Sequence, residues 1–210
     1  AAIFEKSKKT MVLVLDDKEK AAYIFNDLER LLPDQQVLFY PASYRRPYEI
    51  EEVDNANVMM RADALKRCST NQKPTLLVSY PDAFFEQVIT KKELQKKTLT
   101  IQLGESIGRD LINEALFAYD FQRVDFVSQP GEFSVRGGII DIFSYDKDEP
   151  YRIEFFGDDV DRINCFDVET QLSTKPLERI DIVAHLEHKL QSEERQPIWS
   201  FLGDSTTYFL

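Results

Sequence analysis

The first half of this chain contains no glycine. All seven glycines of the 210 residues lie at or after Gly104. This excludes a Gly-rich loop, whose backbone N–H groups can bind phosphate, from the first 103 residues. The charge changes at the same place: residues 1–103 hold 16 Lys and Arg against 15 Asp and Glu, whereas residues 104–210 hold 10 against 22. Two independent changes of composition at one position indicate a domain boundary.

Other absences narrow the class of protein. No apolar run approaches the roughly 20 residues of a membrane span, and the first ten residues lack the apolar core of a signal peptide, so we expect a cytoplasmic protein without membrane contact. The two cysteines, Cys68 and Cys165, fall in different halves, which predicts free thiols rather than a disulfide framework. The net charge of −11 argues against a protein that binds nucleic acid through contacts with phosphates, because such contacts need a basic surface.

The chain is also poor in groups that suggest catalysis. No Ser/His/Asp or Cys/His set stands out, and His185 and His188 lack a third ligand at a suitable spacing for zinc. We therefore expect no catalytic residue, no metal and no cofactor in this chain.

The N-terminal half alternates predicted strands and helices. Apolar runs at 11–15, 37–40 and 75–79 predict strands, the first of them buried on both faces. Helices are predicted at 18–32, where Asp17 can serve as the N-cap, and at 55–68. The first helix has an apolar stripe of Ala21, Ile24, Phe25, Leu28, Leu31 and Leu32. This order indicates a parallel α/β sheet.

Ligands of such sheets bind at the carboxyl ends of the strands. The stretch 40–48 follows one of these ends and combines tyrosines with Arg45 and Arg46. Aromatic and basic residues together can stack nucleic acid bases. Four acidic residues follow directly and cancel the local field, so we interpret the stretch as a solvated loop.

The C-terminal half predicts an antiparallel sheet with one helix. The helix spans 107–117 and is expected to turn Leu111, Ala115 and Phe117 inward. Short loops containing Gly, Pro and Asp separate alternating segments, which is typical of hairpins. The strands are predicted at 98–103, 123–128, 132–135, 138–143, 151–156, 160–166 and 177–183. The fold class is therefore a parallel-sheet α/β domain with an inserted α+β domain built on an antiparallel sheet.

The predicted strand at 151–156 places an arginine and a phenylalanine on the face that is expected to be exposed to solvent. Alternation sends Ile153 and Phe155 to the core and puts Arg152, Glu154 and Phe156 on the other face. Arg136 precedes a glycine pair, predicted to form a β-bulge, on a neighbouring strand. Two interpretations stay open. Phe156 and the arginines form an interface cluster, or Phe156 folds under the Gly157 turn while the arginines pair with Asp141 or Asp158.

Three long segments resemble a known family. Residues 123–143 (RVDFVSQPGEFSVRGGIIDIF), 151–161 (YRIEFFGDDVD) and 166–171 (FDVETQ) are similar to motifs shared by bacterial UvrB and the transcription-repair coupling factors (Mfd). UvrB has a Walker loop and a Tyr-rich hairpin that wedges into DNA. Here the region after Pro41 is short, with Tyr44 and Tyr48 only, and the chain begins beyond the place of a Walker loop. The short hairpin region favours the coupling factors.

The resemblance implies a non-catalytic module in two parts. Residues 1–100, rejoined by 185–210, correspond to a degenerate UvrB-like P-loop domain, and residues 101–184 to a UvrA-binding domain. In the family, two arginines and a phenylalanine contact UvrA, and the matching positions are Arg136, Arg152 and Phe156. We expect Arg152→Glu or Phe156→Ala to abolish UvrA binding without lowering the melting temperature.

The resemblance also implies partners for the parent protein. UvrA is recruited to lesions where RNA polymerase has stalled, and a C-terminal domain of the parent masks the UvrA-binding surface. RNA polymerase and DNA bind other domains, and ATP and Mg act in a downstream motor. Two alternatives are a DNA-engaging fragment of a UvrB-type excision nuclease subunit and a purely autoinhibitory structural module.

Overall fold

The chain forms two compact units. The computed structural model describes residues 1–7, 9–43, 55–70, 73–186 and 194–209. One unit comprises residues 1–91 and 190–210, and the other comprises residues 92–189. These compact units do not test the predicted domain boundaries near residues 100 and 185, which stay predictions. The predicted loop around Arg45 and Arg46, together with Tyr44, Tyr48 and His188, lies outside the described residues.

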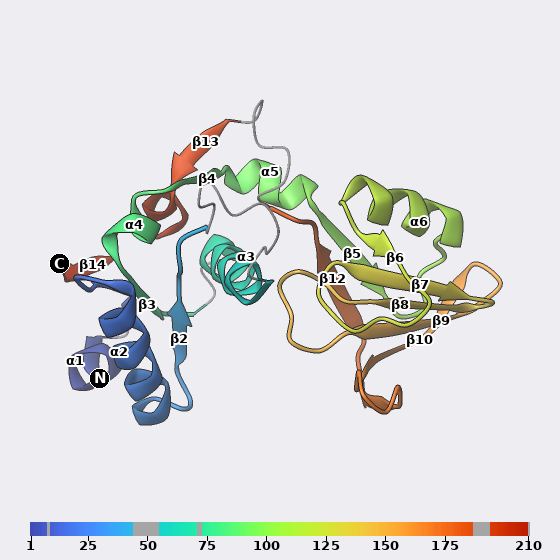
Figure 1. Ribbon diagram of the computed structural model, residues 1–210, viewed down its shortest axis with the longest axis horizontal. Helices are drawn as coiled ribbons and strands as arrows, with labels where there is room; N and C mark the ends of the chain where they lie inside the picture. Colours follow the sequence, from blue (N-terminus) through green and yellow to red (C-terminus); the bar gives the residue numbers. More distant parts are fainter. Residues whose placement is uncertain (8, 44–54, 71–72, 187–193, 210) are drawn as a thin grey trace. The chain divides into compact units, whose positions relative to one another are not determined.

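The first unit is built on a four-stranded parallel sheet. Its strands lie in the order β14 (Thr207–Phe209), β1 (Met11–Val14), β3 (Thr75–Ser79) and β2 (Gln36–Phe39), and every neighbouring pair is parallel (Figure 1). The predicted parallel α/β sheet is confirmed. Burial on both faces, however, belongs to β3, whose five residues are all buried. In β1 it extends only over Met11 and Val12, so the prediction for the whole 11–15 run is wrong.

The helix α2 (Lys18–Leu31) begins and packs largely as predicted. The Asp17 carboxylate accepts a hydrogen bond from the backbone N–H of Lys20 at 2.7 Å, which satisfies one of the free donors of the first turn. Its apolar stripe buries Ala21 and Leu28, and Phe25 lies 5.5 Å from the Phe39 ring of β2. Leu31 is the exception in the predicted stripe, because it is 65% exposed.

Four further helices and two strands complete the described part of the first unit. They are the helices α1 (Ala2–Ser7), α3 (Asn55–Thr70), α4 (Pro81–Phe84) and the 3₁₀ helix η1 (Ile198–Phe201), with the antiparallel strands β4 (Gln87–Ile89) and β13 (Arg195–Pro197). The helix α5 (Lys91–Lys96) contains the junction of the two units. Among the described residues, no helix is both long and apolar enough to cross a membrane.

The second unit is built on a six-stranded, mostly antiparallel sheet. Its order is β11 (Ser173–Pro176), β10 (Asp159–Phe166), β9 (Tyr151–Phe156), β8 (Ile139–Ile142), β7 (Glu132–Arg136) and β6 (Gln122–Arg123). Only β6 and β7 pair in parallel. A separate antiparallel pair consists of β5 (Thr98–Gln102) and β12 (Arg179–Val183). The predicted fold class, with an antiparallel sheet in the second part, is confirmed.

Two strand predictions need correction. The strand expected at 123–128 ends at Arg123, because the chain then turns to bury Val127 against Phe143 and Phe166. The pair Gly137 and Gly138 is not a bulge. It forms the two-residue turn between β7 and β8, where Arg136 pairs with Ile139 and Gly137 takes a positive φ of 60°.

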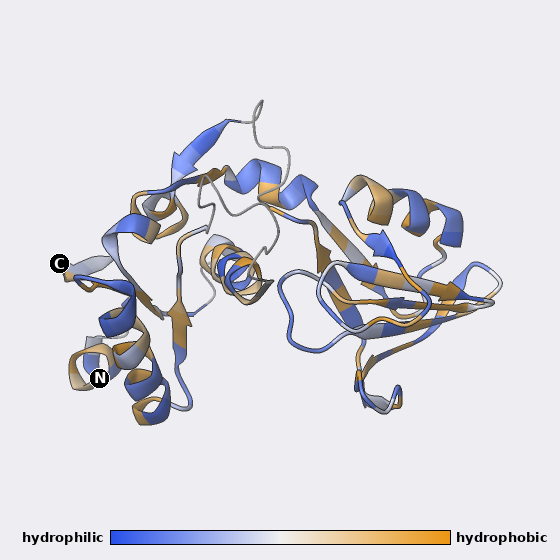
Figure 2. Cartoon of the chain, viewed as in Figure 1, coloured by the Kyte–Doolittle hydropathy of each residue, from blue (hydrophilic) through white to orange (hydrophobic). Residues whose placement is uncertain are grey.

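The helix α6 (Arg109–Ala118) is rotated relative to its predicted orientation. It lies along the six-stranded sheet (Figure 1) and buries Ile112 and Leu116, which are one turn apart. Of the three residues expected to face inward, Leu111 is 59% exposed and Ala115 is half-buried, whereas Phe117 is 56% exposed but packs its ring against the buried Phe133. Several apolar positions of this short helix fit more than one stripe, so periodicity alone does not select the buried one. Figure 2 shows hydrophobic and hydrophilic residues following one another along the strands beneath it.

Both cysteines are free thiols, as predicted, and both are buried. Cys68 lies in α3 of the first unit and Cys165 in β10 of the second. Burial raises the pKa of Cys68 to about 12, so this thiol is held in its unreactive protonated form at neutral pH.

The turn before β7 depends on a buried carboxylate and a glycine. Glu132 accepts hydrogen bonds from the backbone N–H of Ser128 at 2.8 Å and of Gln129 at 3.1 Å. Gly131 has a φ of 87°, and a Cβ atom there would overlap the Tyr145 ring. That ring is itself packed edge-on against Phe121, at 5.1 Å between centroids. The turn formed by residues 128–132 therefore requires a glycine at position 131.

We expect Gly131→Ala to lower the free energy of unfolding by about 3 kcal/mol, because it adds a steric overlap to the strain of a left-handed backbone. Urea denaturation of the full chain measures this change. Gly104→Ala is the matched control, since Gly104 has a φ of 76° but open space around its Cβ position. Its expected cost is about 1 kcal/mol. Equal losses in the two variants would contradict the proposed overlap.

Candidate partner-binding site

The two faces of the six-stranded sheet have different roles. One face forms the core of the second unit, where Phe133, Ile140 and Ile153 are fully buried. Phe117 of α6 packs edge-on against Phe133, with ring centroids 5.2 Å apart. Ser134, Asp141 and Arg152 are directly opposite one another on adjacent strands and share the other face. The predicted alternation of β9 is confirmed, although Phe155 on the core face is only half-buried.

A buried carboxylate holds both predicted arginines. Asp141 is 0% exposed. Its Oδ1 accepts a hydrogen bond from Arg152 Nε at 2.7 Å, and its Oδ2 accepts one from Arg152 Nη2 at 2.9 Å. Arg136 Nη2 donates to the same Oδ2. Of the two partners considered for these arginines, Asp141 is the correct one.

Arg152 is enclosed by the protein on nearly every side. Its Nη1 donates to the Gln171 carbonyl at 2.9 Å, and its guanidinium lies 4.6 Å from the centre of the Phe166 ring. The hydrogen bonds to Asp141 raise its pKa above the ordinary value. Only 14% of its side chain is exposed, against 39% for Arg136. Arg136 therefore offers far more surface to solvent than Arg152.

Phe156 projects into solvent. It ends β9, pairs with Asp159 across the turn at Gly157, and is 82% exposed. The interpretation in which this side chain folds under the turn is wrong. Because Gly157 takes a φ of 66°, the hairpin closes in two residues and Phe156 keeps its strand position. The residue is left on the same face as Arg136.

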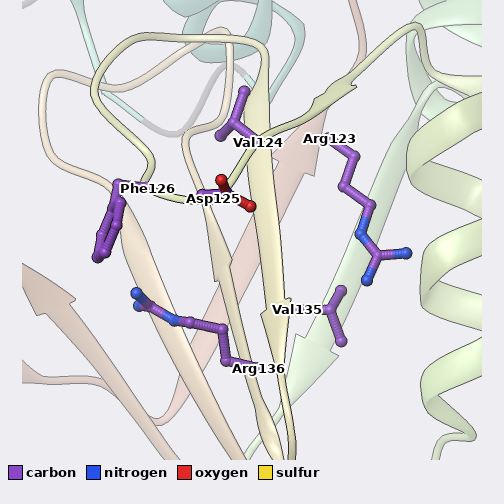
Figure 3. A pocket seen from close by; sticks show the side chains of 6 residues that line it. All are labelled: Arg123, Val124, Asp125, Phe126, Val135 and Arg136. Atoms are coloured by element: carbon purple, nitrogen blue, oxygen red, sulfur yellow. The ribbon is translucent and has the colours of Figure 1, made fainter.

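The structure adds Phe126 to this face, which sequence reasoning missed. The ring is 64% exposed and lies 5.2 Å from the Arg136 guanidinium. Figure 3 shows the Arg136 side chain pointing toward this ring. Its neighbour Val127 is fully buried, so the loop backbone is anchored beneath it. The only signal in the sequence was an aromatic residue beside a valine, which does not reveal a contact with a residue ten positions away.

The arginines are an exception to the charge around them. Residues 92–189 contain 12 Lys and Arg against 20 Asp and Glu. A positively charged patch on a negatively charged unit attracts an acidic surface, and such complementarity can fix the orientation in which two proteins bind.

The strand ends of the first unit are occupied by its own side chains. Arg61, whose side chain is 5% exposed, donates to the Pro41 carbonyl at 2.7 Å and pairs with Glu86 at 2.9 Å. Glu86 also accepts from the backbone N–H of Ser43. In the ranges that the structure describes, no three His, Cys, Asp or Glu side chains are grouped to hold a metal ion.

The second unit matches a known domain family. The family described as "UvrB interaction domain" matches residues 99–188, a range that contains Arg136, Arg152 and Phe156. The candidate residues therefore lie in the part of the chain that is similar to an interaction domain.

The chain as a whole is similar to the transcription-repair-coupling factors. It is 32% identical to that of Bacillus subtilis over 93% of its length, and 31% identical to that of Myxococcus xanthus over 88%. The corresponding protein of Escherichia coli is 26% identical over 87%. In each comparison the chain spans 16% of the length of the relative. The resemblance inferred from the sequence motifs is confirmed.

The contacts of Arg152 change the expected result of replacing it. We now expect Arg152→Glu to lower the free energy of unfolding by about 3–5 kcal/mol, because it sets a carboxylate against the buried Asp141. Arg162→Glu is the control on the same sheet, since that side chain is 68% exposed and its change is expected to stay within about 1 kcal/mol. Urea denaturation measures both. An unchanged midpoint for Arg152→Glu would show that Asp141 does not need this partner.

Proposed function

We propose that this chain, a part of a transcription-repair-coupling factor, is a non-catalytic module that recruits UvrA to lesions where RNA polymerase has stalled. The observation that supports this most is the position of Phe156 within the residues that match the UvrB interaction domain. There a large aromatic side chain is 82% exposed on the sheet face that carries Arg136. Exposed aromatic residues beside arginines are typical of the energetic centre of protein interfaces.

The three predicted residues have different roles in the proposed contact. Phe156 fills an apolar pocket of UvrA, and Arg136 pairs with an acidic side chain there. Arg152 acts mainly as a positioning residue, because it shares Asp141 with Arg136 and has little exposed surface. Since Asp141 already holds Arg136, less side-chain entropy is lost on binding.

In this proposal, the other functions of the parent protein belong to parts outside this chain. ATP and Mg act in its motor, and RNA polymerase and DNA bind elsewhere in the parent. The C-terminal domain of the parent covers the face of Phe156 and Arg136 until the motor engages stalled polymerase. Covering by another domain would remove the exposed Phe156 ring from water, which favours such a contact.

Titration calorimetry with the UvrA protein encoded in the same genome tests the proposal. We expect Phe156→Ala to weaken binding at least tenfold, while the melting temperature of the full 210-residue chain stays the same, because the side chain is exposed. Tyr23→Ala is the matched control: Tyr23 is 73% exposed and lies in α2 of the first unit. Unchanged affinity for Phe156→Ala would refute this site.

Two further measurements separate the alternatives. A DNA-engaging fragment would bind duplex DNA in fluorescence anisotropy with a steep dependence on salt. A purely autoinhibitory module would bind the isolated C-terminal domain of the parent and not UvrA. We expect no DNA binding, because acidic residues outnumber basic ones in the second unit.

A further inference from the structure

We propose that Phe126 is a second aromatic anchor of the UvrA interface and that the depression beside it accepts an acidic side chain of the partner. The inference rests on the proposed function. It extends the contact from the end of β9 to the edge of the sheet at β6 and β7.

The backbone next to Phe126 is anchored, although the ring of Phe126 is exposed. The residue that follows it, Val127, packs with Phe143 and Phe166 in a buried cluster, against which Val124 is also packed. The Val127 carbonyl accepts a hydrogen bond from Gln171 Nε2 at 3.3 Å. An exposed ring on an anchored backbone loses little conformational freedom on binding, which favours its use as an anchor.

Phe126 and Asp141 together fix the direction of Arg136. Asp141 binds the Nη2 group of Arg136, and the Phe126 ring lies 5.2 Å from the guanidinium carbon. A guanidinium against an aromatic ring is favourable even at exposed sites, and more so once a partner removes water. Binding at this ring therefore strengthens an interaction that already exists in the free chain.

The depression beside this pair is open and carries a net positive charge. It has a volume of about 650 Å³ and is lined by Arg123, Val124, Asp125, Phe126, Val135 and Arg136. Figure 3 shows Arg123 on the opposite side of the depression from Phe126. Arg123, which pairs with Phe133, and Arg136 flank the edge of β7 on its two sides. Arg136 shares Asp141 with Arg152, so these two arginines and Arg123 together exceed Asp125 and Asp141 by one positive charge. This excess favours an acidic side chain at the edge, and the valines and the ring favour an apolar residue next to it.

The depression exists because β6 is short. β6 pairs with β7 only at Glu132 and Phe133, and the chain then leaves the sheet. The outer edge of β7 at Val135 and Arg136 is consequently left beside the loop that carries Phe126. Because neighbouring strands are about 4.8 Å apart, Arg136 on β7 lies about 10 Å from the line of β9, where Phe156 ends the strand. One partner surface can cover all three residues.

Titration calorimetry of the full chain with UvrA tests the proposal. We expect Phe126→Ala to weaken binding at least tenfold, with Tyr23→Ala unchanged. Arg123→Glu should weaken binding about tenfold at 50 mM salt, with a smaller effect at 500 mM, because salt screens the pairing. Lys175→Glu is the matched charge reversal, since this exposed residue lies on β11 at the opposite edge of the same sheet. We expect its affinity to be unchanged.

The outcomes separate this inference from the proposed function. If Phe156→Ala weakens binding while Phe126→Ala and Arg123→Glu do not, the second anchor is refuted and the recruitment of UvrA stands. If the unaltered chain does not bind UvrA at all, both fail. If Arg123→Glu and Lys175→Glu weaken binding equally, the effect is one of overall charge and the acidic-residue depression is refuted.

Discussion

The buried carboxylate of Asp141 is the group on which the proposed binding face depends. It lies in the middle of β8, is fully buried, and binds two guanidinium groups. A carboxylate in that position is costly unless cations compensate it, so Arg136 and Arg152 are required by the fold before any partner is considered. The same requirement places Arg136 at the surface in a defined direction. Stability and recognition are therefore linked through one side chain.

The two faces of the six-stranded sheet differ: one forms the hydrophobic core, and the other carries the proposed binding residues. The face under α6 is apolar and largely buried, whereas the other is closed at Asp141 by the loops that contain Val127 and Gln171. It stays open toward Arg136 and Phe156. The first unit uses its strand ends differently, because Arg61 and Glu86 occupy them with an internal ion pair. In the second unit, Phe126 and Phe156 are exposed on the face that carries Arg136.

Much of this arrangement could be predicted from local patterns. Alternation along β9 placed Arg152 and Phe156 on one face, and short Gly-containing turns indicated hairpins. Asp141 was recognised as a possible partner of the arginines, but a pattern could not show that it binds both. The exposure of Phe156 depended on whether the turn at Gly157 closes in two residues. Phe126 was missed because its contact with Arg136 joins a loop to a strand, and no periodicity relates the two.

The sequence by itself determined the alternation of the main strands and helices, the family resemblance and the face of each residue in β9. These follow from spacing, because strand geometry alternates side chains and the motifs are long. Only the tertiary structure decided that α6 buries Ile112 and Leu116, that β6 stops at Arg123, and that Asp141 is shared. Each of these depends on which neighbouring element lies opposite a residue. That is a matter of packing between segments distant in the chain, which local spacing does not encode.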